Sequence, residues 1–171
     1  DLADVVRVAI GEVEDFTRIN LLSLDETTIG GNAAVDLAHL IDRHDILRTA
    51  VLWQQLPQPV QVVYRSATLH VEEVELEPGR DPEEQVRQWM RPECQRIDLA
   101  RAPLLHVRVA AGVAGEWYLL LSVHHIVEDA SSMKEVIAEI TTHLAGRATE
   151  LPATLPYRNH VAQALAYAKT H

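Results

Sequence analysis

Short apolar runs with a two-residue period divide the chain into candidate strands. Residues 117–123 are nearly all apolar, as expected of a strand covered on both faces. Residues 104–110 instead alternate, which places Leu105, Val107 and Val109 on one face. An acidic run over residues 69–76 is typical of a strand at a sheet edge. Residues 56–58 are placed to close a hairpin, and further strands are predicted at residues 16–24, 48–54 and 59–64.

The apolar spacing of amphipathic helices recurs in four segments, at residues 32–45, 81–95, 131–144 and 156–169. Asp81 is predicted to be the N-cap of the second helix, with Pro82 at its first position and Pro92 ending or kinking it. Ser132 and Glu135 have the spacing of a capping box at the start of the third helix. Because strands and helices mix without strict alternation, we expect an α+β fold with helices packed on a largely antiparallel sheet.

The composition narrows the class of protein. With 171 residues, 47% of them hydrophobic, the chain is long enough for one domain with a sizeable core. Its net charge of -10 argues against nucleic-acid binding, which needs a basic face. No apolar run reaches the roughly 20 residues of a membrane span, and residues 1–15 lack a signal-peptide pattern. Cys94 is the only cysteine, which excludes a disulfide framework. We therefore expect a cytoplasmic protein that binds neither nucleic acid nor membrane.

The segment from Ser122 to Ser132 carries the candidate chemistry, because it leaves a buried strand and enters a helix. It holds two adjacent histidines, His124 and His125. Adjacent side chains of an extended backbone point to opposite sides, so one ring is expected to turn inward and the other toward solvent or a channel. A neutral imidazole can take a proton from an amine near pH 7. A nearby carboxylate, Glu128 or Asp129, would orient the site or charge-pair with it.

Two alternatives to a catalytic histidine are a purely structural pair and a metal site. His125 and Asp129 have the i,i+4 spacing of two ligands on one helix face. A zinc site needs three or four convergent ligands, and the sequence offers no third one at a suitable spacing. No metal is therefore expected.

The pattern His-His-x-x-x-Asp after an apolar strand, from His124 to Asp129, resembles the signature of the condensation domains of nonribosomal peptide synthetases. Residues 41–49 are similar to the Arg-His-Glu/Asp-x-Leu-Arg-Thr block of the same family. Residues 97–105 and 155–161 resemble two further family segments in the right order. The likeness runs over residues 24–167 and implies a chloramphenicol acetyltransferase-like sandwich lobe.

By this resemblance, the chain belongs to machinery for nonribosomal peptide synthesis. The implied reaction forms an amide bond between aminoacyl or peptidyl thioesters, which are carried on the phosphopantetheine of peptidyl carrier protein domains. No bound cofactor is implied. His125 is the implied catalytic residue, as a base or a positioning group, and His124 packs the loop. Asp129 is implied to be structural and to pair with Arg48.

The chain departs from the family pattern in three places. Ala130 stands where the family usually has Gly, residues 1–16 do not match the family's opening block, and the length suits one of the two lobes of a full condensation domain. We therefore expect residues 1–171 to form a single domain, the amino-terminal lobe, without the second lobe. Its expected partners include the carboxy-terminal lobe or neighbouring synthetase modules.

Several related functions stay open on the sequence. One is an epimerisation, cyclisation, ester-forming, dual epimerising and condensing, or free-standing acyltransferase domain of the same superfamily. Another is a non-catalytic or truncated lobe that only binds carrier protein. In either case the isolated lobe is expected to be a poor catalyst, because the family's histidine acts in a channel between two lobes.

Overall fold

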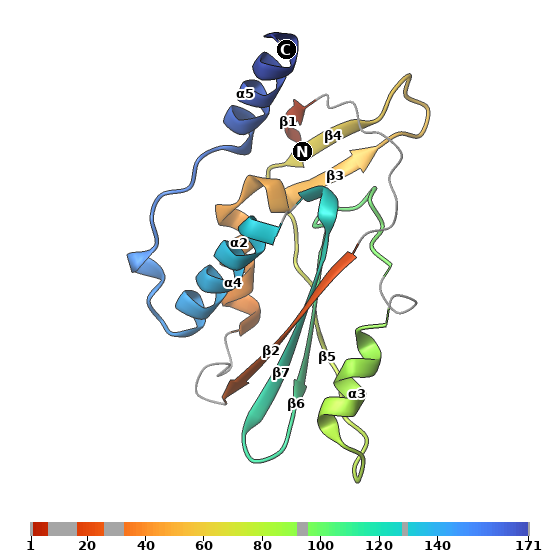
Figure 1. The fold of residues 1–171 in the computed structure, drawn as a ribbon, viewed down its shortest axis with the longest axis vertical. Helices are drawn as coiled ribbons and strands as arrows, with labels where there is room; N and C mark the ends of the chain where they lie inside the picture. The colour runs from red at the N-terminus through yellow and green to blue at the C-terminus, as the bar shows by residue number, and fades with distance from the viewer. Residues whose placement is uncertain (1, 7–16, 26–32, 92–95, 128–129, 171) are drawn as a thin grey trace.

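The computed structural model describes residues 2–6, 17–25, 33–91, 96–127 and 130–170, and its main layer is a four-stranded sheet (Figure 1). In spatial order the strands are β2 (Thr17–Asp25), β7 (Glu116–His124), β6 (Leu105–Ala111) and β5 (Val71–Glu73). The β2–β7 and β6–β7 pairs are antiparallel. The β5–β6 pair is parallel. The sheet is therefore largely antiparallel, as predicted.

A second, three-stranded sheet lies at one end of the first. Its order is β1 (Leu2–Val6), β4 (Val60–Tyr64) and β3 (Thr49–Leu52), all antiparallel. The predicted hairpin between β3 and β4 is confirmed. The pairing of β1 with β4 was not predicted, because acidic residues break the apolar pattern of this segment. The free edge of β3 is joined to a loop by a hydrogen bond from Val51 N to Leu99 O of 2.7 Å.

Among the helices of the described residues, two cover one face of the larger sheet and one covers the other (Figure 1). The first two, α2 (Ala33–Arg43) and α4 (Ala130–Leu144), pack against each other. On the other side lies α3 (Pro82–Trp89), and α5 (Tyr157–Thr170) lies beside β1. The described residues also form three 3-10 turns: η1 (Asp45–Arg48), η3 (His125–Val127) and η4 (Ala148–Glu150).

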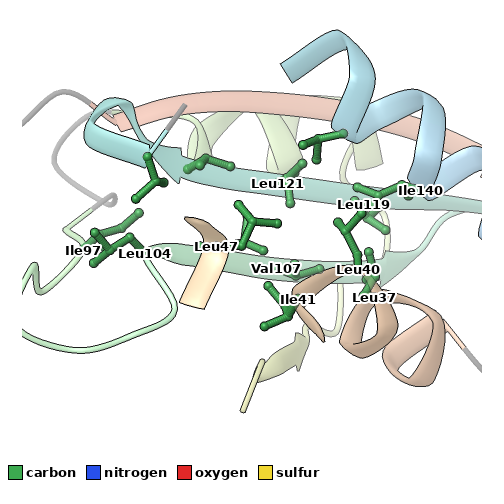
Figure 2. Close-up of a cluster of buried hydrophobic side chains, with 14 of the residues drawn as sticks. Leu37, Leu40, Ile41, Leu47, Ile97, Leu104, Val107, Leu119, Leu121 and Ile140 are labelled. Atoms are coloured by element: carbon green, nitrogen blue, oxygen red, sulfur yellow. The ribbon is translucent and has the colours of Figure 1, made fainter. Parts of the chain in front are cut away.

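The hydrophobic core fills the space between the larger sheet and the α2–α4 layer. Figure 2 shows Leu37 and Leu40 of α2 next to Leu119 of β7, and these residues, Ile41 and Leu121 are all buried in one cluster. The predicted inward face of β6 is confirmed, since its alternate residues belong to this core. Strand β7 is buried continuously from Tyr118 to His124, which confirms that both of its faces are covered. This central strand is the rigid element that carries the histidine pair.

Several predicted boundaries were wrong, each for a local reason. The strand expected at residues 48–54 is only Thr49–Leu52, because Arg48 ends the turn η1. The strand expected at residues 69–76 is only Val71–Glu73. It is an edge strand that pairs with β6 alone, and its exposed acidic side chains add no packing that would lengthen the pairing.

Some of the predicted helix starts and ends are confirmed and others are wrong. Asp81 is the N-cap of α3, as predicted, and accepts a hydrogen bond from Glu83 N at 3.0 Å. That helix ends at Trp89, before Pro92, and residues 92–95 lie outside the described part of the chain. The capping role expected of Ser132 was wrong, because α4 already begins at Ala130 and Ser132 lies within its first turn. Among the described residues, no helix combines the length and apolar character that a membrane crossing requires.

Candidate active site

His124 closes strand β7 and turns into the protein. It pairs with Thr17 of β2, and its backbone N–H donates to Leu104 O at 3.1 Å. The side chain is 2% exposed, and its Nδ1 accepts the backbone N–H of Ile126 at 3.1 Å. A neutral ring that accepts at Nδ1 carries its proton on Nε2. His124 therefore fixes the start of the turn that follows the strand, which supports the packing role implied for it.

His125 is the first residue of η3, and its side chain is exposed. The predicted division of the pair, one ring inward and one outward, is thus confirmed. Two buried residues hold this turn in place. His124 directly precedes it, and Val127, its last residue, is 6% exposed and part of the core. The backbone that carries His125 is therefore anchored at both ends, so an exposed imidazole is presented from a well-supported position.

The carboxylates predicted for this site, Glu128 and Asp129, lie outside the described residues, as does Cys94. The next described residue is Ala130, which opens α4. A residue in the first turn of an α-helix has negative φ, which any L-residue adopts. The Ala found where the family usually has Gly therefore costs nothing through backbone conformation.

The Arg48 side chain donates hydrogen bonds to backbone carbonyls at the junction of α2, η1 and β4. Its guanidinium donates to Ile41 O at 2.8 Å, to Asp42 O at 2.6 Å and to Tyr64 O at 3.1 Å. The first two acceptors lie in the last turn of α2, where carbonyls lack intrahelical partners and a cation is favourable. Pairing of Arg48 with Asp129 stays a prediction.

The same sequence block contributes a second cluster, which the sequence did not reveal. Glu139 of α4 accepts from His44 Nε2 at 2.7 Å and from Arg43 Nε at 3.2 Å, all through one carboxylate oxygen. Burial raises the pKa of Glu139, but the hydrogen bonds from His44 and Arg43 outweigh it and leave that pKa below its usual value. This cluster fastens the end of α2 to the helix that follows the histidine turn.

Asp45 extends the connection to the C-terminal helix. Both of its carboxylate oxygens accept the backbone N–H of Tyr157, the first residue of α5, at 3.0 Å. Arg43 also donates to Pro152 O at 2.6 Å, and Thr154 Oγ1 donates to Arg43 O at 3.0 Å. The Arg-His-Asp part of the block therefore ties α2, α4 and α5 together. The block was recognisable in the sequence, but its partners about 100 positions away were not.

An open hollow of about 630 Å³ lies at the same end of the larger sheet as the histidine pair. Leu105 and His106 of β6 line it, and these residues pair with Val123 and Ser122, the last residues of β7 before His124. Burial lowers the pKa of His106, and the neighbouring Arg108 lowers it further against a smaller opposing effect of Glu72. Its imidazole is therefore held toward the neutral form.

No group of three His, Cys, Asp or Glu side chains among the described residues is arranged to hold a metal ion. What the described side chains offer is an exposed imidazole in the turn that directly follows a buried strand. Such an arrangement suits proton transfer or positioning of a polar reactant.

Comparison with known proteins places this geometry in a family. The condensation domain family matches residues 34–171. The chain is 43% identical over 130 residues to malpinin synthetase of Mortierella alpina, a match that covers 75% of this chain and 2% of that protein. It is 33% identical over 121 residues to bacitracin synthase 3 of Bacillus licheniformis, which covers 70% of this chain and 2% of that protein. The chain thus spans a small fraction of the length of these curated relatives.

Solved structures give the same picture of the fold. The epimerization domain from the third module of tyrocidine synthetase B aligns with a TM-score of 0.76 at 20% identity, over 90% of this chain and 36% of that one. The first condensation domain of the CDA synthetase aligns with a TM-score of 0.74 at 20% identity, over 90% of this chain and 40% of that one. The fold is therefore the chloramphenicol acetyltransferase-like α+β fold that was expected. The chain belongs to the condensation domain family.

Proposed function

We propose that residues 1–171 act as the amino-terminal, histidine-bearing lobe of a domain that forms amide bonds in nonribosomal peptide synthesis. The substrates are aminoacyl or peptidyl thioesters on the phosphopantetheine arms of peptidyl carrier proteins. A carboxy-terminal lobe completes the channel, and neighbouring synthetase modules are further partners. The observation that carries this proposal is the exposed His125 at the end of a buried strand, inside the family's signature.

The proposed reaction is an aminolysis of a thioester. The acceptor amine attacks the donor carbonyl carbon, a C–N bond forms, and the C–S bond then breaks. The proton lost by the amine passes to the departing thiolate, and the amide product stays on the acceptor arm. The exposed ring of His125 either carries that proton or holds the amine in line for attack, since both roles need the same position. Apart from the arms that carry the substrates, this scheme uses no cofactor.

The buried neighbour has a different part in this proposal. His124 Nδ1 accepts a hydrogen bond from the backbone of the turn, and this bond positions the chain that carries His125. Arg48 and Asp129 are proposed to act through the fold: Arg48 fastens the end of α2, and Asp129 is proposed to pair with it. Neither is proposed to touch the reacting atoms.

An aminolysis assay tests the proposal with a carrier-bound donor and a carrier-bound acceptor. The chain is assayed alone and with a separately supplied carboxy-terminal lobe. We expect turnover only with both lobes, because one open face neither excludes water nor surrounds the reactants. His125→Ala should reduce that turnover by at least about 100-fold, within the range typical of a general acid–base group.

The matched control is His160→Ala, which removes an exposed histidine on α5, away from the larger sheet. It should leave turnover unchanged. Carrier binding without turnover, and no effect of His125→Ala, would favour the non-catalytic lobe instead. Inversion of the carrier-bound residue in place of amide formation would favour the epimerisation alternative. Robust turnover by the monomeric chain alone would show that the two-lobed channel is unnecessary.

A further inference from the structure

The 630 Å³ hollow at the histidine end of the larger sheet is lined by charges of the opposite sign to that of the whole chain. The protein carries a net charge of -10, yet two arginines, Arg96 and Arg101, line this hollow against one acid, Asp98. Asp98 already accepts the backbone N–H of Ala100 at 3.0 Å through one carboxylate oxygen. The hollow is thus a local cationic site on an acidic protein.

The two arginines differ from the ion-paired arginines of the fold. Five described arginines have a carboxylate partner within 4 Å, including Arg43 on Glu139 and Arg108 on Glu72. Within the described residues, neither Arg96 nor Arg101 has such a partner, and both side chains are exposed. Their guanidinium donors are therefore available to a ligand in the hollow, where Asp98 is the one lining acid.

The remaining walls suit a small organic molecule with an anionic head. Ser66 and Thr68 supply hydroxyl groups, whereas Ala102 and Pro103 supply apolar surface. The volume lies within the usual range of small-molecule sites, roughly 300–1,000 Å³. Guanidinium groups bind phosphate through paired N–H donors, and two of them match the two charges of a phosphate monoester better than the single charge of a carboxylate.

We propose that this hollow is a binding site for a phosphate ester, held by Arg96 and Arg101. The site lies at the same end of the larger sheet as the histidine pair, because its Leu105 and His106 pair with the residues that directly precede His124. The inference rests on the charge and shape of the hollow and stands whether or not the chain catalyses amide formation. The phosphate can belong to a free small molecule or to the arm of a carrier protein, since both present the same chemistry.

The test is a titration of the 171-residue chain, followed by backbone amide NMR shifts and calorimetry. The probes are inorganic phosphate, phenyl phosphate and, as the carboxylate comparison, acetate. Saturable shifts are expected around residues 96–106 with phosphate and phenyl phosphate, with weaker binding of acetate. The affinity should fall as salt rises, because the guanidinium groups are exposed and screened.

Two variants and a matched control decide the assignment. Arg96→Gln and Arg101→Gln should each weaken phenyl phosphate binding by about tenfold, the effect of losing one charged hydrogen-bonding group. Both side chains are exposed, so the fold should survive, which the amide spectrum checks. Arg91→Gln removes another exposed arginine, two residues beyond α3 and outside the hollow, and should change affinity less than about twofold. Equal loss in all three variants, equal binding of acetate, or no saturable binding would overturn the proposal.

A last pair of probes separates the two sources of phosphate. Pantetheine 4′-phosphate is compared with pantetheine, which lacks the phosphate, and with phenyl phosphate. Tighter binding of pantetheine 4′-phosphate than of phenyl phosphate would assign the site to a carrier arm. Equal affinity for the two phosphates would assign it to a free ester. Equal binding of pantetheine and its phosphate would contradict a phosphate site altogether, without bearing on whether His125 takes part in amide formation.

Discussion

Glu139 should stabilise the fold through the cluster it forms with Arg43 and His44, and the substitution Glu139→Gln tests this. The carboxylate accepts two hydrogen bonds on one oxygen, at 2.7 Å from His44 and 3.2 Å from Arg43. The side chain of Glu139 is 15% exposed and those of its partners are 24% exposed. A glutamine keeps the shape but loses the charge, so both partners would face a weaker acceptor.

The expected cost follows from the strength of such bonds. A hydrogen bond to a charged group contributes about 1.5–3 kcal/mol, and partial exposure reduces this through solvent screening. Arg43 also keeps its bond to Pro152 O in the variant. We therefore expect a loss of about 2 kcal/mol in the free energy of unfolding. For a domain of this size that corresponds to a fall of about 4–8 °C in Tm.

The pH dependence supplies a second, independent signature. The pKa of Glu139 is lowered in the folded state, so its stabilisation is present above the unfolded pKa of about 4.3 and is lost as the pH falls through the folded pKa. The difference between wild type and Glu139→Gln should be full at about pH 6 and should shrink steadily below about pH 4.3. Because His44 is one of the two partners of Glu139, the substitution His44→Ala should remove much of the stability difference that Glu139→Gln causes in the wild type.

Urea unfolding, followed by tryptophan fluorescence and far-ultraviolet circular dichroism at about pH 6 and about pH 3.5, measures both effects. Glu135→Gln is the matched control, because Glu135 lies one turn earlier on α4 and is exposed. It should change the free energy of unfolding by less than about 0.5 kcal/mol. A Glu139→Gln variant no less stable than this control, or a difference that is as large at the lower pH as at the higher, would refute the role assigned to the cluster.

Three further experiments test other parts of the fold. Asp45→Ala removes the cap of α5 and should lower the local stability of that helix by about 1 kcal/mol. The loss should appear as faster hydrogen exchange confined to α5. Equally faster exchange across the whole chain would contradict a local role. Gly146→Ala places a side chain at φ +70° just after α4, where there is open space, so backbone strain is the only cost. The free energy of unfolding should fall by about 1 kcal/mol. An unchanged midpoint in urea would argue against this strain. A double-mutant cycle of Arg48→Met and Asp129→Asn should give a coupling above about 0.5 kcal/mol if the two side chains pair, and additive losses would show that they do not.

The chain's own pattern determined the local elements that carry the histidine pair. A continuous apolar run is expected of a strand covered on both faces, and β7 is buried from Tyr118 to His124. Adjacent residues of an extended chain face opposite ways, so one histidine had to turn inward, and that residue is His124. These features depend on neighbours in the sequence, which is why periodicity and spacing were sufficient to predict them. The same holds for the β3–β4 hairpin and the cap at Asp81.

The tertiary structure alone decided which distant segments meet. Strand β1 joins β4, and β5 runs parallel to β6, although neither segment has a strong pattern of its own. Glu139 became the partner of His44 because α2 and α4 pack side by side, and 95 positions separate the two residues. The cationic hollow likewise combines the connection after β4, the loop before β6 and β6 itself. Periodicity reports which side of an element is buried, whereas the choice of partner depends on how several such faces are satisfied together in one packed core.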